Sequence, residues 1–230
     1  MISEKSLELN VLENIIRIVR THYRNAFLYG FTLKQESKHG LDAAINLPNG
    51  LSISGLQFKK PISSSGGIYR FEINNNGKRD QHLKLYLLSS IINRIFNVSL
   101  IHYALPAISD TSELAVHSPN FLPRTYFIDP SRMPVETLDN NVHIVEINTH
   151  NNTAIVFSEP KRLDILDTKT FIDNIIGKKS ILELSKIKEL KNVQLYDYVK
   201  YFDVIDSVWQ EKLKLLARTS WKLRLKGIIV

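Results

Sequence analysis

Cysteine is absent from the 230-residue sequence. Without a thiol, disulfide bonds, thiolate zinc sites, iron–sulfur clusters and cysteine nucleophiles are all excluded. Long apolar runs are absent as well. The longest cover only a few residues, as at residues 85–88, whereas a membrane-spanning helix needs roughly 20. The first residues lack the basic segment and following apolar segment of a secretory signal. We therefore expect a cytoplasmic protein with no membrane partner.

The composition is that of a globular chain, with 43% hydrophobic and 23% charged residues, and it excludes the collagen-like and disordered classes. The charge is uneven along the chain. Residues 161–230 hold 15 of the 30 Lys and Arg residues but only 9 of the 23 Asp and Glu residues, so residues 1–160 are almost balanced. A basic third suits contact with a polyanion such as DNA or RNA, and solvated helix faces are the alternative interpretation.

The spacing of apolar residues predicts a mixed α/β protein. Helical spacing predicts a helix over about residues 5–24, and shorter apolar runs predict three strands within residues 27–59. A strand at 68–73, a second helix that starts near Asp80 and a strand at 98–105 follow. Further strands are predicted at 125–128, 142–148 and 153–157, and the Ser- and Gly-rich residues 63–67 are predicted as a loop. We expect one α/β domain over residues 1–160 and a basic helical region over residues 161–230 packed on it.

Asn49-Gly50 lies between two apolar runs, which is a strong signal for a β-hairpin. Antiparallel pairing across this turn brings Asp42, near the start of one strand, close to Gln57 and Lys59 near the end of the other. A carboxylate within an apolar strand is costly unless it is paired or binds a metal ion. A carboxylate, an amide oxygen and an ammonium group in one place suit Mg²⁺-assisted hydrolysis of a phosphodiester.

These residues resemble a motif of the PD-(D/E)xK nuclease superfamily. The resemblance consists of Gly40-Leu41-Asp42, a hairpin, and then Gln57-Phe58-Lys59. With Gln in the second acidic position, the motif is similar to that of the Mrr-type restriction endonucleases. The chain departs from the superfamily pattern in that no Pro precedes Asp42 and Gln57 replaces an acid.

The resemblance covers roughly residues 5–105 and implies a restriction-endonuclease-like core with the order helix, three strands, helix, strand. It also implies a metal-dependent endonuclease that hydrolyses DNA in restriction or anti-phage defence. Mg²⁺ or Mn²⁺ would be the cofactor, RNA is an alternative substrate, and a homodimer is implied because cutting both strands needs two sites.

The same resemblance implies roles for individual residues. Asp42 and a second carboxylate would hold the metal ion, Gln57 would complete its coordination and Lys59 would position the attacking water. The second carboxylate is Glu36, in the loop before Asp42, or Glu8, on the apolar stripe of the first predicted helix. We favour Glu36 because its loop adjoins the strand of Asp42.

Four basic residues are candidates for contact with nucleic acid: Lys60, Lys222, Arg224 and Lys226. Lys60 follows Lys59 and is expected on the opposite face of the strand. Two histidines invite a functional interpretation. His39 is near Asp42 and is more simply a loop residue, and His82 is more simply an ordinary residue of the first turn of its helix.

Other interpretations are open from the sequence alone. One alternative is that Asp42 and Lys59 form a salt bridge that serves the fold rather than a reaction. Gln57 leaves open a nucleic-acid-binding or regulatory protein on a catalytically weakened nuclease fold. The predicted helical region at the C-terminus leaves open a partner-binding subunit of a defence system.

Overall fold

The computed structural model describes residues 2–32, 40–47, 53–74, 81–96, 99–139, 141–157 and 160–177. Several predictions concern residues outside these ranges. They are the metal ligand Glu36, the loop residue His39, the turn at Asn49-Gly50, the helix start at Asp80 and the nucleic-acid contacts Lys222, Arg224 and Lys226.

Two five-stranded sheets form the body of the described chain. The first has the order β1 (Phe27–Gly30), β2 (Ala43–Asn46), β3 (Ile53–Phe58), β6 (Ile101–Pro106) and β7 (Thr125–Ile128). The second has the order β10 (Lys161–Leu163), β9 (Thr153–Val156), β8 (Val142–Asn148), β5 (Ile68–Asn74) and β4 (Pro61–Ser65). The pairs are antiparallel except that β3 and β6 run parallel.

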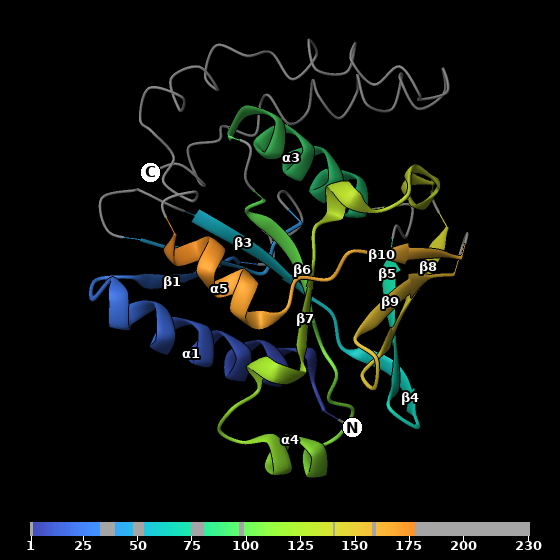
Figure 1. Cartoon of the computed structure of the whole chain (residues 1–230), viewed down its shortest axis with the longest axis horizontal. Coiled ribbons are helices and arrows are strands. Elements are labelled where there is room, and N and C mark those ends of the chain that lie inside the picture. The colour runs from blue at the N-terminus through green and yellow to red at the C-terminus, as the bar shows by residue number, and fades with distance from the viewer. Residues whose placement is uncertain are drawn as a thin grey trace.

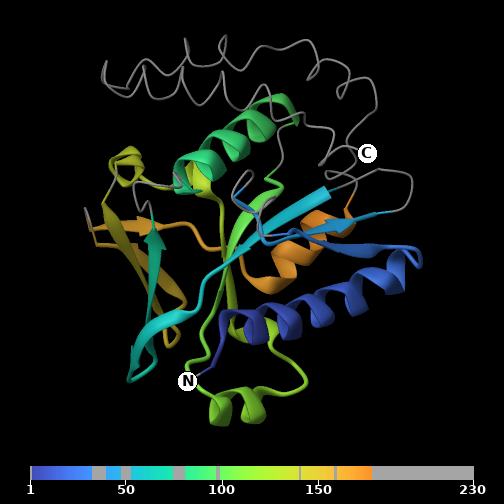
Figure 2. The same cartoon turned by 180° about the vertical axis from the view of Figure 1, so that it is seen from behind.

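Helices cover the first sheet on both sides (Figures 1 and 2). Helix α1 (Glu4–His22) packs beside α5 (Thr168–Ile176) on one face, and α3 (Gln81–Phe96) lies on the other face together with the second sheet. The remaining helical segments are α4 (Thr111–His117) and the 3₁₀ turns η2 (Leu122–Arg124), η3 (Pro130–Arg132) and η4 (Val135–Leu138). None of the described helices is long and apolar enough to cross a membrane.

Two hydrophobic cores lie on the two faces of the first sheet. The central strand β6 contributes to both, because Tyr103 and Leu105 point into the core beneath α3 whereas Ala104 points into the core beneath α1. Every residue of β6 is buried, as expected for a strand covered on both faces. The apolar stripe of α1 packs against β2 and β3 in the second of these cores, and this contact fixes the helix against the predicted hairpin.

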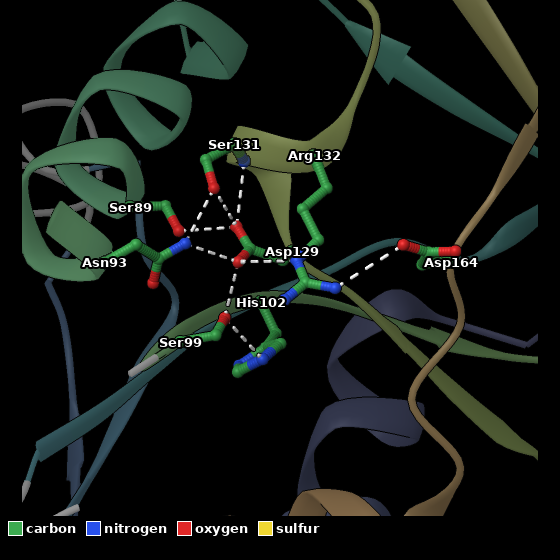
Figure 3. A network of polar contacts seen from close by, with 8 residues as sticks. All are labelled: Ser89, Asn93, Ser99, His102, Asp129, Ser131, Arg132 and Asp164. Atoms are coloured by element: carbon green, nitrogen blue, oxygen red, sulfur yellow. Dashed lines mark hydrogen bonds and ion pairs between the residues drawn. The ribbon is translucent and has the colours of Figure 1, made fainter. Parts of the chain in front are cut away.

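A buried polar cluster around Asp129 ties α3 to the sheet (Figure 3). One carboxylate oxygen of Asp129 accepts hydrogen bonds from the hydroxyls of Ser89 (2.6 Å) and Ser131 (2.7 Å). The other accepts from Asn93 Nδ2 (2.7 Å) and the hydroxyl of Ser99 (2.7 Å). Ser89 and Asn93 belong to α3 and Ser99 precedes β6, so this carboxylate joins residues that lie 30 to 40 positions before it in the sequence.

The mixed α/β class is confirmed, and most predicted elements lie close to their expected bounds. The strands expected at 125–128 and 142–148 match β7 and β8. The loop expected at residues 63–67 was wrong, because residues up to Ser65 form strand β4 and only Gly66 and Gly67 form the turn to β5. Four of the five residues of β4 are exposed, so this edge strand lacks the apolar alternation that would have revealed it.

The body continues beyond residue 160, where we expected the first domain to end. Strand β10 pairs with β9 in the second sheet. Helix α5 packs against α1 and β7, and its Phe171 ring stacks on that of Phe127 at 3.8 Å between centroids. Residues 161–177 therefore belong to the same body as the sheets.

Candidate active site

Asp42 lies at the start of the β2–β3 pair, directly before β2, and only 8% of it is exposed. Its backbone N–H donates to the carbonyl of Leu56 at 2.9 Å. Its Oδ2 accepts from Gln57 Nε2 and from the backbone N–H of Phe58, both at 2.7 Å. The antiparallel pairing of β2 with β3 thus brings Asp42 and Gln57 together, as predicted.

Lys59 is joined to the same cluster through a residue of α3. Lys59 Nζ donates to Gln81 Oε1 at 2.9 Å, and Gln81 Nε2 donates to Gln57 Oε1 at 2.9 Å. Two glutamine side chains therefore lie between the ammonium group and the carboxylate. None of the ion pairs found among the described residues joins Asp42 to Lys59, so the structure does not support a direct salt bridge between them.

Two carboxylates of α1 contribute to the electrostatics of this cluster. Burial raises the pKa of Asp42 to about 7; the Phe58 hydrogen bond opposes this shift, the negative charges of Glu4 and Glu8 add to it, and Lys59 opposes it weakly. Glu8 is buried and Lys5 Nζ lies 2.6 Å from its Oε1. Glu4 Oε2 accepts from the backbone N–H of Lys60 at 3.1 Å. The N-terminal half of α1 therefore brings negative charge to Asp42.

Of the two carboxylates considered as a second metal ligand, Glu8 lies near Asp42, whereas Glu36 is outside the described residues. Glu4 was not predicted, although its position four residues before Glu8 places both on one face of a helix. Gln81 was not predicted either. It opens α3, and the sequence does not tell which residue of the first helical turn will face the hairpin.

His82, the neighbour of Gln81, is buried in the interior. Its Nδ1 is 2.9 Å from the hydroxyl of Tyr103, and its Nε2 is 2.8 Å from the hydroxyl of Thr137. Burial lowers the pKa of His82 to about 3, with a smaller contribution from His143. A neutral histidine held on both ring nitrogens is a structural residue of the first helical turn, and it anchors the end of α3 that carries Gln81.

Among the described residues, no group of three or more His, Asp or Glu side chains is arranged to hold a metal ion. Lys60 is half-buried beside the site and is held by its backbone to Glu4. Comparison of the chain with protein-family models, curated proteins and solved structures finds no match in any of the three.

Proposed function

We propose that this chain is a metal-dependent endonuclease that hydrolyses phosphodiester bonds of DNA, with a role in restriction or anti-phage defence. The observation that carries the proposal is the hydrogen-bonded cluster of Asp42, Gln57, Gln81 and Lys59. The order α1–β1–β2–β3–α3–β6, with β4 and β5 inserted before α3, also agrees with the core that the resemblance to the PD-(D/E)xK superfamily implies.

The donor set fits a Mg²⁺ or Mn²⁺ ion. Both hydrogen bonds from described residues to the Asp42 carboxylate end on Oδ2, and Oδ1 would be the oxygen that binds the ion. Glu4 and Glu8 add negative charge near this buried carboxylate, and a divalent cation would offset it. Mg²⁺ is commonly held by one or two carboxylates together with waters. Asp42 and Glu8 would hold the ion.

Gln57 fits this role less well than its place in the motif implies. Its Oε1 accepts a hydrogen bond from Gln81, and its Nε2 donates to Asp42 Oδ2 and to the carbonyl of Phe58. The amide oxygen that would coordinate the ion is thus already in use. We assign Gln57 to orienting Asp42 rather than to coordinating the ion.

A bound divalent ion would supply a polarised phosphate and an activated water. The chain itself would supply the ammonium group of Lys59, which is half-buried and oriented by Gln81. A fixed cation beside the scissile phosphate stabilises the negative charge that develops in the transition state. Lys59 would also orient the attacking water by donating to its oxygen.

Cleavage of supercoiled plasmid DNA in the presence of Mg²⁺ or Mn²⁺ tests the proposal. We expect Lys59→Ala and Asp42→Asn to abolish cleavage while each variant still unfolds cooperatively on heating. Lys60→Ala is the matched control, since it removes the neighbouring lysine, and we expect it to weaken binding without abolishing cleavage. If the wild type does not cleave, or if Lys59→Ala cleaves at the wild-type rate, the proposal is wrong.

A second candidate is a nucleic-acid-binding protein on a catalytically weakened nuclease fold. It is favoured by the engagement of Gln57 Oε1 with Gln81, which leaves one oxygen ligand fewer for a metal ion. In this case, DNA binding would fall steeply with salt and no cleavage would occur. Reversing the charge of Lys222, Arg224 and Lys226 to Glu would flatten this salt dependence if those residues contact phosphates. A chain that neither binds nor cleaves DNA would indicate a partner-binding subunit.

A further inference from the structure

Two amide side chains connect the carboxylate of Asp42 to the ammonium group of Lys59, and every step is a hydrogen bond. Gln57 Nε2 donates to Asp42 at 2.7 Å, Gln81 Nε2 donates to Gln57 Oε1 at 2.9 Å, and Lys59 Nζ donates to Gln81 Oε1 at 2.9 Å. We call these four side chains the amide relay. It joins β2, β3 and α3 at one point.

The chemistry of the two ends fixes the direction of both amides. Lys59 can only donate and an ionised Asp42 can only accept. If the amide of Gln81 were turned over, its NH₂ group would face the ammonium of Lys59. If the amide of Gln57 were turned over, its oxygen would face Asp42 Oδ2 and the carbonyl of Phe58, which is 3.1 Å from Nε2 as placed. One orientation alone therefore satisfies all four groups.

We propose that Gln81 is a positioning residue, which sets the place of the Lys59 ammonium relative to Asp42 through the amide relay. This inference rests on the proposed nuclease function. Gln81 is suited to this role because it accepts from Lys59 and donates to Gln57 with the same side chain. An aliphatic side chain supplies neither contact, and a carboxylate supplies only the first.

The neighbouring residue makes this position rigid. His82 is fully buried and is held to Tyr103 at 2.9 Å and to Thr137 at 2.8 Å, and its ring stacks on that of Tyr103 at 5.8 Å. Tyr103 pairs in register with Gln57 across the parallel strands β3 and β6. The first turn of α3 is thus tied to the strand that carries Gln57, so Gln81 acts from a fixed helix end.

The test compares Gln81→Met and Gln81→Glu in the full-length chain, with Ser90→Ala on the same helix as the control. Methionine keeps the length of the side chain but removes both hydrogen bonds, whereas glutamate keeps an acceptor for Lys59. We expect Gln81→Met to lower kcat for plasmid cleavage about 10- to 100-fold, because small misplacements of a catalytic group have effects of this size. The KM should stay within about twofold of the wild type. The kcat of Gln81→Glu should lie between those of Gln81→Met and the wild type. The kcat of Ser90→Ala should match that of the wild type.

A second measurement does not depend on cleavage. In ¹⁵N–¹H spectra, the side-chain amide of Gln57 should exchange slowly in the wild type, because it is buried and both of its hydrogens are bonded. Gln81→Met should shift this signal and speed its exchange.

The outcomes separate the two proposals. If the wild type cleaves DNA and Gln81→Met keeps its kcat within twofold while only its melting temperature falls, Gln81 is merely structural and this inference is wrong. An unchanged Gln57 amide signal in Gln81→Met would also overturn it. If the wild type does not cleave any DNA, the proposed function fails first, and the positioning role fails with it.

Discussion

At the scale of single residues, Asp42 lowers the stability of the folded chain at neutral pH. Its pKa is about 7 in the folded protein, mainly because of burial, and about 4 for an ordinary aspartate. Between these two pH values the folded state keeps a proton that the unfolded state has released. Stability must therefore fall as the pH rises from about 4 to about 7. The difference between the folded and the ordinary pKa corresponds to as much as about 4 kcal/mol of unfolding free energy.

Asp42→Asn should remove this dependence. The single carbonyl oxygen of asparagine can accept both hydrogen bonds that now end on Oδ2. We expect the variant to be about 1–4 kcal/mol more stable than the wild type at pH 8 and similar to it at pH 4.5. Urea unfolding at the two pH values measures this. A variant that is less stable at pH 8 would show that the Asp42 charge serves the fold.

Gln57→Glu restores the acid of the superfamily motif, yet we expect it to destabilise this protein. The motif of the superfamily has an acid at this position, yet here the side chain lies 2.7 Å from Asp42 as a hydrogen-bond donor. Glutamate would place two carboxylates in contact, and like charges raise each other's pKa. We expect a loss of about 1–3 kcal/mol at pH 8, and a smaller loss at pH 5, where the pair shares a proton. Improved cleavage by Gln57→Glu at pH 8, with unchanged stability, would contradict the amide relay.

Sequence reasoning about single residues succeeded where a strand pattern applied. The side-chain period of a strand and the hairpin signal together predicted that Asp42, Gln57 and Lys59 would meet. It did not predict that a second glutamine would stand between Lys59 and Gln57. Gln81 reaches the hairpin through the packing of α3 on the first sheet, and packing across 24 residues of chain leaves no local signal.

At the scale of elements, the close approach of β3 to its neighbours depends on Gly55. A Cβ atom at this position would lie 2.8 Å from Leu41 Cδ1 and 2.9 Å from Ile101 Cδ1. Both of these side chains are buried, so they have little room to move. Leu41 directly precedes Asp42, which means that the packing of this glycine also sets the backbone beneath the carboxylate.

Gly55→Ala should therefore affect both the fold and the site. We expect a loss of about 1–3 kcal/mol in unfolding free energy, because a crowded core resists one added methyl group, together with slower DNA cleavage. Gly30→Ala on edge strand β1 is the control, since nothing lies within 4 Å of its added Cβ. Its stability should change by less than about 1 kcal/mol. If the two substitutions lower the melting temperature equally, the crowding of an added Cβ at Gly55 does not destabilise the fold.

The helices and strands that could be predicted from the sequence share one property: their apolar residues recur at a regular spacing. Helix α1 and strands β7 and β8 have one face or both faces in a core. Strand β4 has neither, and its serines match the composition of a loop. Its pairing with β5 follows from the turn at Gly66 and Gly67, whose positive φ values of 54° and 78° suit glycine. Such turn geometry is hard to read from a Ser- and Gly-rich segment.

At the scale of the whole molecule, the cluster around Asp129 holds α3 to the first sheet (Figure 3). Burial alone would raise the pKa of Asp129, but side-chain hydrogen bonds led by Ser89 and Ser99 outweigh it, so the pKa is lowered. The pKa shift of Asp129 is therefore opposite in sign to that of Asp42. The ionised carboxylate of Asp129 is the form that accepts these hydrogen bonds. It therefore stabilises the fold above the ordinary pKa of aspartate, and this stabilisation is lost as the pH falls through the lowered pKa of the folded state.

Asp129→Ala should cost about 3 kcal/mol or more at pH 7, because it leaves several buried donors without an acceptor. Asp164→Ala is the matched control. Asp164 is largely exposed and pairs with Arg132 at 3.4 Å, so its removal should change stability by less than about 0.5 kcal/mol. Chemical denaturation of both variants provides the comparison. A loss as small for Asp129→Ala as for Asp164→Ala would mean that the cluster adds little to the fold.

The parallel pairing of β3 with β6 has a consequence for how the proposed site is built. Parallel neighbours need a long crossover connection, and here the connection runs from Lys59, through β4, β5 and α3, to β6. Lys59 and Gln81 stand 22 positions apart, one where the chain leaves β3 and the other where α3 begins. Their hydrogen bond closes the loop of chain that contains β4 and β5. In the proposed site, the contact that orients Lys59 therefore exists only when α3 lies against the end of β3, whereas the contact of Asp42 with Gln57 needs only the pairing of β2 with β3.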